Sequence, residues 1–238
     1  MKTLQNKIYE GFYKNAGGMV QPRTKDELAE EISIRLDRGQ TNLNDIDTSK
    51  ITDMSDLFYE FSQNVDVSLW NVSNVTNMRY MFHGCTDFNC DLSRWDVSKV
   101  EDMENMFAYC QHFNSDLSRW NVSKVKNMSY LFLDCREFNC DLSKWDVSSV
   151  TNMAGMFINC YVFNSDLSKW DVSNVVEMNS MFNSCENFNS DLSKWDVSNV
   201  RYMTGMFNHC PKFCCDLSEW RTIKRYIYSP IDIYTSHL

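Results

Sequence analysis

Glycine and proline are scarce in this chain of 238 residues, which contains only 7 Gly and 3 Pro. Calcium-binding nonapeptide repeats need frequent glycine turns, so we expect no metal site and no cofactor. No apolar run approaches about 18 residues, so we expect no membrane span. Lys and Arg number 23 against 32 Asp and Glu, and the net charge of -9 argues against a nucleic-acid partner.

Catalytic motifs are also missing. The four histidines occupy unrelated places in the sequence, and no HExxH, GxSxG, GxGxxG or phosphate-binding loop occurs. We therefore expect no enzymatic activity. The first residues lack the layout of a signal peptide, and no lipobox cysteine or anchor is evident, so we expect a cytoplasmic protein.

Ten cysteines are present, but they do not pair at the spacing of a disulfide framework or a zinc site. Six of them recur at one position of a repeat, at Cys85, Cys110, Cys135, Cys160, Cys185 and Cys210. Because free cysteine is usually buried, we expect a row of small buried thiols.

The dominant feature is a repeat of 25 residues. Tryptophan recurs without a slip at Trp70, Trp95, Trp120, Trp145, Trp170, Trp195 and Trp220. The surrounding residues move with it, and one unit reads FNCDLSRWDVSKVEDMENMFAYCQH over residues 88–112. A fixed period of this length is typical of structural units that stack in register.

Two periodicities alternate within each unit. Phe88, Cys90 and Leu92 are spaced by two, which predicts a half-buried strand. Apolar residues from Val100 to Cys110 then follow at helical spacing, which predicts a short helix. Neither element could bury its apolar face alone, so we expect an α/β solenoid in which about seven units stack their strands in parallel.

The pattern FNxDLSxWDVSxVxxMxxMFxxC resembles the 25-residue repeat of BspA-like surface proteins, which occur in mycoplasmas and other bacteria. That family is similar to the Treponema-type leucine-rich repeats, and the resemblance implies a leucine-rich-repeat-like, right-handed coil. Members are mostly secreted or lipid-anchored adhesins, or have no known role. The resemblance offers no catalytic residues.

Three regions are expected. Residues 1–39 form a helical N-terminal cap, residues 40–220 form the repeat region, and residues 221–238 form a C-terminal cap or tail. Within the first region, Thr24 and Glu27 form a capping box for a helix over residues 25–36, whose apolar face carries Leu28 and Ile32.

Units differ most from one another just after the predicted helix, so we expect binding there. The predicted partner-binding residues are Tyr109, His112, Leu133, Ile158, Tyr161 and Val162. The alternative is the polar strand face, formed by Asn89, Asp91, Asn114, Asp116, Asn139, Asp141, Asn164 and Asp166. Arg94 and its equivalents are expected to pair with this aspartate row.

The sequence therefore predicts a non-catalytic repeat scaffold that binds a protein partner through variable surface positions. Two alternatives remain open. One is an acidic inhibitor or decoy that blocks a basic site on its target, which the net charge allows. The other is a surface adhesin, as the family resemblance implies.

Overall fold

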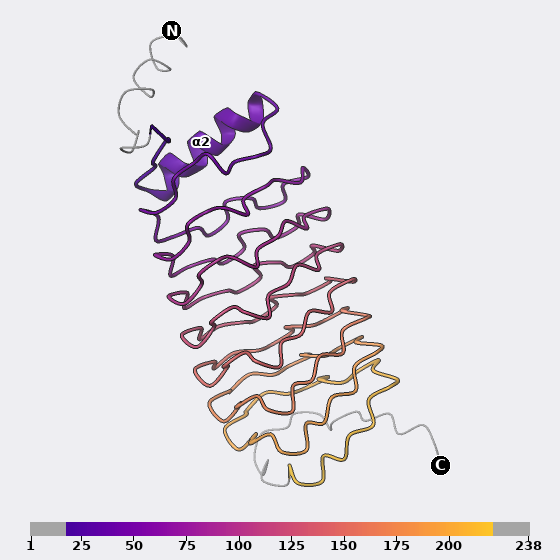
Figure 1. The fold of residues 1–238 in the computed structure, drawn as a ribbon. Coiled ribbons are helices and arrows are strands. Elements are labelled where there is room, and N and C mark those ends of the chain that lie inside the picture. Colours follow the sequence, from indigo (N-terminus) through magenta and orange to yellow (C-terminus); the bar gives the residue numbers. More distant parts are fainter. Residues whose placement is uncertain (1–17, 221–238) are drawn as a thin grey trace.

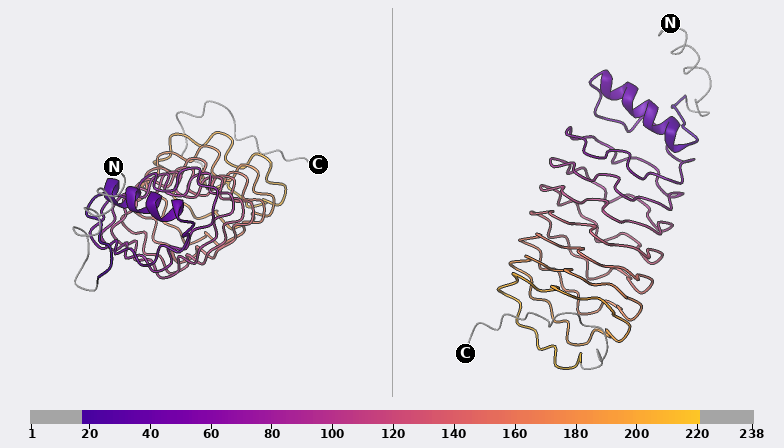
Figure 2. Two further views of the ribbon diagram at one scale, coloured as in Figure 1. Left: turned by 90° about the horizontal axis from the view of Figure 1, so that it is seen from above. Right: turned by 180° about the vertical axis from the view of Figure 1, so that it is seen from behind.

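The structure is a computed structural model and describes residues 18–220. The 25-residue units form coils piled along one axis (Figure 1), and the opposite view shows the same regular succession (Figure 2). Equivalent rings stack between neighbouring units. The centroids of Trp95 and Trp120 are 6.5 Å apart with 1° between the ring planes, and those of Phe107 and Phe132 are 5.8 Å apart. The units are thus stacked in register.

Helix α2, Lys25–Asp37, lies over the N-terminal end of the pile (Figure 1). Its first turn is capped by Thr24, whose hydroxyl accepts the N–H of Glu27 at 3.2 Å, as the sequence predicts. Leu28 and Ile32 are buried against the first coils. The sequence patterns in residues 1–17 and 221–238 lie outside the described residues.

The predicted secondary structure of the units is wrong. Apart from α2, the described residues contain only isolated parallel bridges, such as Asn77 with Asp102 and Asp102 with Asn127, and no sheet. The chain is therefore neither an α/β solenoid nor a leucine-rich-repeat-like coil of short parallel strands and short helices.

The segment predicted as a helix, residues 100–110, is a series of tight turns. Asn105 and Tyr109 adopt left-handed conformations, with φ of 55° and 64°, and a right-handed helix cannot pass through such residues. The N–H of Ala108 donates to the carbonyl three residues back, but the N–H of Tyr109 donates to Leu133 of the next unit at 2.6 Å. Bonding between units thus replaces the helical hydrogen-bond ladder.

The segment predicted as a strand, residues 88–92, keeps the expected alternation of buried and exposed side chains. Backbone N–H groups of this segment and of its equivalent in the next unit, however, donate to side chains of neighbouring units. The N–H of Asn114 donates to Oδ1 of Asn89 at 2.9 Å, and the N–H of Leu92 donates to Oγ of Ser115 at 3.0 Å. Without backbone-to-backbone pairing there is no strand here.

Buried polar atoms of the core are satisfied between units. The indole Nε1 of Trp120 donates to the Leu92 carbonyl at 3.0 Å, and the thiol of Cys110 donates to the Phe82 carbonyl at 3.0 Å. Every cysteine is free, and the five from Cys85 to Cys185 in the repeated row are buried, as predicted. Burial raises the pKa of the Cys85 thiol to about 12, so these thiols are unreactive in the folded chain.

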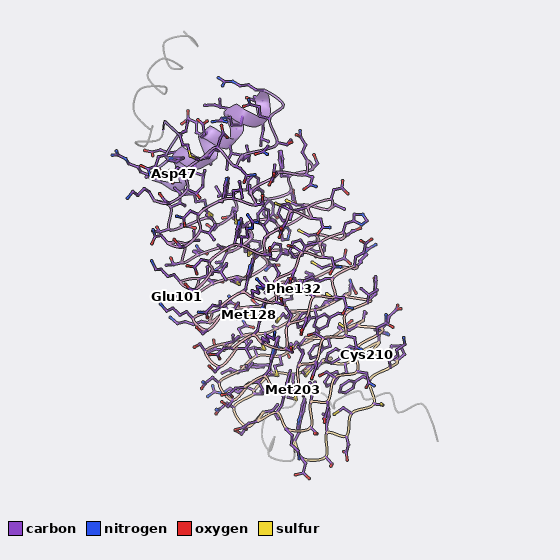
Figure 3. The ribbon with its side chains drawn as sticks, viewed as in Figure 1. Asp47, Glu101, Met128, Phe132, Met203 and Cys210 are labelled. Carbon is purple, nitrogen blue, oxygen red and sulfur yellow. The ribbon has the colours of Figure 1, made fainter. Side chains whose placement is uncertain are left out.

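Each coil has two lateral edges. Figure 3 places Glu101 at one edge and Cys210 at the other, with Met128 and Phe132 between them. The variable positions immediately precede and follow the cysteine row, to which Cys210 belongs. They therefore occupy the second of these two edges.

Candidate protein-binding surface

Three of the predicted binding residues lie in successive units at this edge. The N–H of Tyr109 donates to the Leu133 carbonyl at 2.6 Å, and the N–H of Asp134 donates to the Ile158 carbonyl at 2.7 Å. The Tyr109 side chain is 43% exposed, and Leu133 and Ile158 are partly exposed. The three residues thus lie in neighbouring units at one edge, with Leu133 and Ile158 at one repeat position and Tyr109 at the position after it.

The other three predicted residues follow the cysteine row. His112 lies between carboxylates of both neighbouring units, with Nδ1 2.9 Å from Oε1 of Glu137 and Nε2 4.0 Å from Oδ1 of Asp87. Tyr161 is partly exposed and Val162 is 40% exposed. No ring contact within residues 18–220 joins Tyr161 to Tyr109, so the six residues form two groups instead of one patch.

A cluster of aromatic rings was not predicted. The ring of Tyr59 stacks on His83 with centroids 4.7 Å apart and 1° between the planes. Tyr80 is 6.3 Å from Tyr59 and 5.5 Å from His83, and Tyr109 meets His83 edge-on at 5.2 Å. Tyr130 makes no ring contact with this cluster in the described part of the chain, but it stands at the repeat position of Tyr80 two units later. We call these five residues together the tyrosine strip.

The tyrosine strip is largely open to solvent. Tyr59 is 47% exposed, Tyr109 43% and Tyr130 38%. The hydroxyl groups of these three tyrosines have no protein partner within the described part of the chain. The strip therefore offers apolar ring faces and free hydroxyl groups on one surface.

The backbone under the strip is strained. Tyr80, Tyr109 and Tyr130 all have positive φ, at 53°, 64° and 56°. A left-handed conformation costs a residue with a side chain about 1–2 kcal/mol, and glycine stands at the Tyr130 position in the next unit, at Gly155. Other units also have positive φ at these two positions, for example at Asn105, Asp134 and Ser180, so the conformation belongs to the repeat and does not by itself mark the strip.

Charged groups fix one side of the strip. The guanidinium of Arg79 lies 2.9 Å from Glu104, 3.6 Å from Asp102 and 5.8 Å from the centre of the Tyr80 ring. The hydroxyl of Tyr80 donates to Glu104 at 3.2 Å. Burial, with the Glu104 charge, raises the pKa of Tyr80, so this tyrosine is a firmly held hydrogen-bond donor.

His83 is the most enclosed member of the strip. Burial lowers its pKa, although the nearby Glu60 carboxylate opposes this shift, so the ring is neutral at pH 7. Its Nδ1 atom is buried and has no hydrogen-bond partner within the described residues. Glu60 itself has no cation within 4 Å in the same part of the chain.

The family model described as "Mycoplasma protein of unknown function, DUF285" matches residues 31–145 and 126–229. The chain belongs to this family. The two matches overlap and together span the repeat units of the DUF285 chain. No curated protein and no solved structure matches it.

The alternative binding face of the DUF285 chain is occupied by structural hydrogen bonds. Oδ1 of Asn114 accepts the N–H of Asn139 at 3.0 Å, and Oδ1 of Asn139 accepts the N–H of Asn164 at 2.9 Å. The asparagine row thus joins neighbouring units. Its side-chain oxygens are committed to the fold.

The aspartate row of the same face is exposed and ionised. Oδ1 of Asp91 accepts the Ser93 N–H at 2.9 Å, and these hydrogen bonds lower the pKa of Asp91. Asp116, Asp141 and Asp166 make the same turn. The predicted ion pairs with Arg94 and its equivalents do not form within 4 Å among the described residues.

Metal and membrane features were also sought in the described part of the DUF285 chain. No group of three or more His, Cys, Asp or Glu side chains there could hold a metal ion. None of its helices has the length and apolar character to cross a bilayer.

Sequence reasoning missed Tyr59, Tyr80 and Tyr130 for identifiable reasons. Tyr59 belongs to the diverged first unit, which is one residue out of register. Tyr80 and Tyr130 stand inside the segment predicted as a helix. A signal was present only for Tyr80 and Tyr130, which are 50 residues apart and so stand at one repeat position two units apart.

Proposed function

We propose that this chain is a non-catalytic protein-binding scaffold whose partner binds across the tyrosine strip, Leu133 and Ile158. The observation that carries the proposal is the gathering of exposed aromatic rings on one edge of the first four units. In later units the position of Leu133 and Ile158 is occupied by Asn183 and Asn208. Apolar character is therefore confined to one part of an otherwise repetitive edge.

The chemistry of the strip suits protein recognition. Tyrosine is enriched among residues that dominate binding energy, because it buries a large ring and few rotatable bonds must be ordered. Contiguous exposed apolar surface on a folded chain commonly marks an interaction site. The resemblance to BspA-like surface proteins, many of them adhesins, supports a binding function of this general kind.

An acidic decoy is the second candidate, and the aspartate row is the observation that favours it. Asp91, Asp116, Asp141 and Asp166 present like charges along one face, and hydrogen bonds keep their pKa values low. Binding through that row would weaken steeply as salt rises, because exposed charges are screened. Binding through the tyrosine strip would be much less sensitive to salt.

Affinity capture tests the proposal. The immobilised chain and a Tyr59→Ala/Tyr109→Ala variant would be exposed to an extract of the organism that encodes the chain. We expect the native chain to retain at least one protein at both 0.15 and 0.5 M salt. The amount of that protein recovered on the double variant should be about tenfold lower.

The matched control is Tyr202→Ala, because Tyr202 is 51% exposed but lies outside the strip, in the unit of residues 188–212. It should retain the partner in full. A strip variant that recovers every captured protein at the native yield would remove the strip as the binding surface. Capture that disappears at 0.5 M salt in the native chain would favour the decoy.

A further inference from the structure

We propose that two copies of this chain pair side by side, with their long axes parallel, through what we call the charged face. This face consists of the aspartate row and of the basic row beside it, which is formed by Arg94, Arg119, Lys144 and Lys169. The inference goes beyond the proposed function, because the tyrosine strip takes no part in it. It follows from the unpaired charges of the face, from their period and from their arrangement in two rows of opposite sign.

The charges of this face have no close partner within the chain. Each basic residue stands three positions after an aspartate of the same unit, and every member of both rows is exposed. No ion pair within 4 Å joins either row to an oppositely charged side chain among residues 18–220. The carboxylates and the cations are therefore available to a facing surface.

Like charges also repel one another along the rows. Hydrogen bonds from Ser93 lower the pKa of Asp91, and the Arg94 charge adds to this, but the Asp116 carboxylate of the next unit opposes it. Asp166 acts on the pKa of Asp141 in the same sense as Asp116 does on that of Asp91. Because like charges at neighbouring positions are destabilising, a facing row of opposite sign would stabilise both rows.

The period of the rows favours a second copy of this chain as the partner. Both rows repeat once per unit, and the parallel bridges between units set that repeat at about 4.8 Å. An extended strand presents side chains of one face about every 6.8 Å, so it falls out of register by about 2 Å at each unit. An α-helix advances about 5.4 Å per turn, which is closer, but its sequence would have to supply both signs in two rows. A second copy has the same period and both rows by construction.

The stacked rings show that successive units keep nearly the same tilt. The indole planes of Trp95 and Trp120 are 1° apart, and those of Trp170 and Trp195 are 3° apart. The rows therefore bend little along the pile (Figure 1), and two piles can remain in contact over several units.

The order of the rows fixes the orientation of the pair. A two-fold axis that runs along the piles, between two facing copies, places the aspartate row of each copy over the basic row of the other. A two-fold axis across the piles would place like rows over each other. Two-fold interfaces, in which both subunits use the same surface, are the commonest in homo-oligomers. We therefore expect a parallel dimer.

Sedimentation equilibrium of the full chain tests the pairing. Facing charges lie closer together than the screening length of about 10 Å at 0.1 M salt, which shrinks to about 3 Å at 1 M salt. At submillimolar chain concentrations we expect a dimer whose dissociation constant rises at least about tenfold from 0.1 to 1 M salt. A monomer at both salt concentrations, or a dimer that salt does not weaken, would overturn the inference.

Charge exchange identifies the surface. Arg119→Asp/Lys144→Asp should abolish the dimer, and since neither side chain makes a hydrogen bond or ion pair in the described chain, the fold should be kept. Asp116→Lys/Asp141→Lys should also be monomeric, and tryptophan fluorescence checks its fold because Asp116 closes a turn with Ser118. An equimolar mixture of the two folded variants should dimerise, because each reversed row then faces a row of opposite sign. A first variant that stays dimeric, or a mixture of folded variants that stays monomeric, would contradict the pairing.

The matched control is Lys99→Asp/Lys124→Asp. It also reverses two positive charges in neighbouring units, but at a repeat position five residues beyond the basic row. Its dissociation constant should change by less than about threefold; loss of the dimer would mean that net charge and not the charged face controls association. Tyr59→Ala/Tyr109→Ala should leave the dimer intact, so the pairing and the proposed function can fail separately.

Spin labels on the exposed thiol of Cys214 test the orientation. The label is attached in a Cys215→Ser background, where serine is the residue that the preceding unit carries at Ser190. Parallel copies hold both labels at the same end of the dimer, whereas antiparallel copies hold them at opposite ends. A distance between labels comparable with the length of the pile would overturn the parallel arrangement.

Discussion

The contact between Tyr130 and Gly155 gives a sharp test of the strip geometry. A Cβ atom placed on Gly155 would lie 2.4 Å from both Cδ1 and Cε1 of Tyr130, and 3.0 Å from Cδ1 of Ile158. Gly155 also has φ of 61°. Gly155→Ala would therefore combine a strained backbone with a displaced ring.

The expected magnitude follows from these two effects. Alanine in a left-handed conformation costs about 1–2 kcal/mol. Forcing a packed ring aside typically costs a further ~1–3 kcal/mol. We expect Gly155→Ala to lower the free energy of unfolding by about 2–5 kcal/mol.

Gly205→Ala is the matched control. Gly205 stands at the same repeat position two units later, with φ of 67°, and its added Cβ would lie 3.0 Å from Nδ2 of Asn208 and at an ordinary contact distance of 3.5 Å from Oγ of Ser180. Since that amide belongs to a flexible side chain, we expect only the backbone cost of about 1–2 kcal/mol.

Urea unfolding followed by tryptophan fluorescence measures both variants, because the seven Trp report on the whole pile. Tyr130→Ala in the Gly155→Ala background should recover the part of the loss that is due to the ring. Equal losses in Gly155→Ala and Gly205→Ala would mean that Tyr130 does not lie on Gly155. Its place in the tyrosine strip would then be wrong.

Three further outcomes are expected. Trp145→Phe removes the indole N–H that donates to the Leu117 carbonyl at 3.0 Å, so the free energy of unfolding in urea should fall by about 1–3 kcal/mol. An unchanged free energy of unfolding would contradict this role of the indole row. In the native chain a thiol reagent should label exposed Cys214 first by mass spectrometry, and Cys135, buried with its pKa raised, should react only after unfolding. Hydrogen bonds lower the pKa of Asp116 below its ordinary 3.8, so its contribution to stability is present above that value and is lost as pH falls further. The urea concentration at the midpoint of unfolding should therefore fall as the pH is lowered below about 4. It should fall less steeply in Asp116→Asn, whose amide oxygen can still accept in the turn. An identical pH profile for the two proteins would contradict the assignment.

Much of the burial pattern could be read from the sequence. The positions of Trp95, Leu92 and Met103 in the core follow from apolar spacing, because burial of apolar surface does not depend on which backbone conformation delivers it. Helix α2 could be predicted to within one residue because its cap and apolar face are local features. The aspartate turns are local in the same sense, since Asp91 accepts the N–H of Ser93 two residues on, whereas the asparagine row joins residues 25 positions apart.

The backbone of the units could not be predicted in this way. Spacing by three and four is shared by a helix and by successive tight turns, and the choice between them depends on the neighbouring unit. The N–H of Asn105 donates to Ser129 at 2.9 Å in the next unit, a bond that no local pattern reveals. Such bonds hold Asn105 and its equivalents in left-handed conformations.

By itself the sequence determined that 25-residue units repeat, which side chains they bury and where the capping helix begins. Those features depend on local spacing and on the insolubility of apolar side chains in water. Only the tertiary structure decided that the units are turns without strands or helices, and that four tyrosines from four units share one edge. Both outcomes depend on contacts between residues about 25 positions apart, which exist only once the coils are stacked.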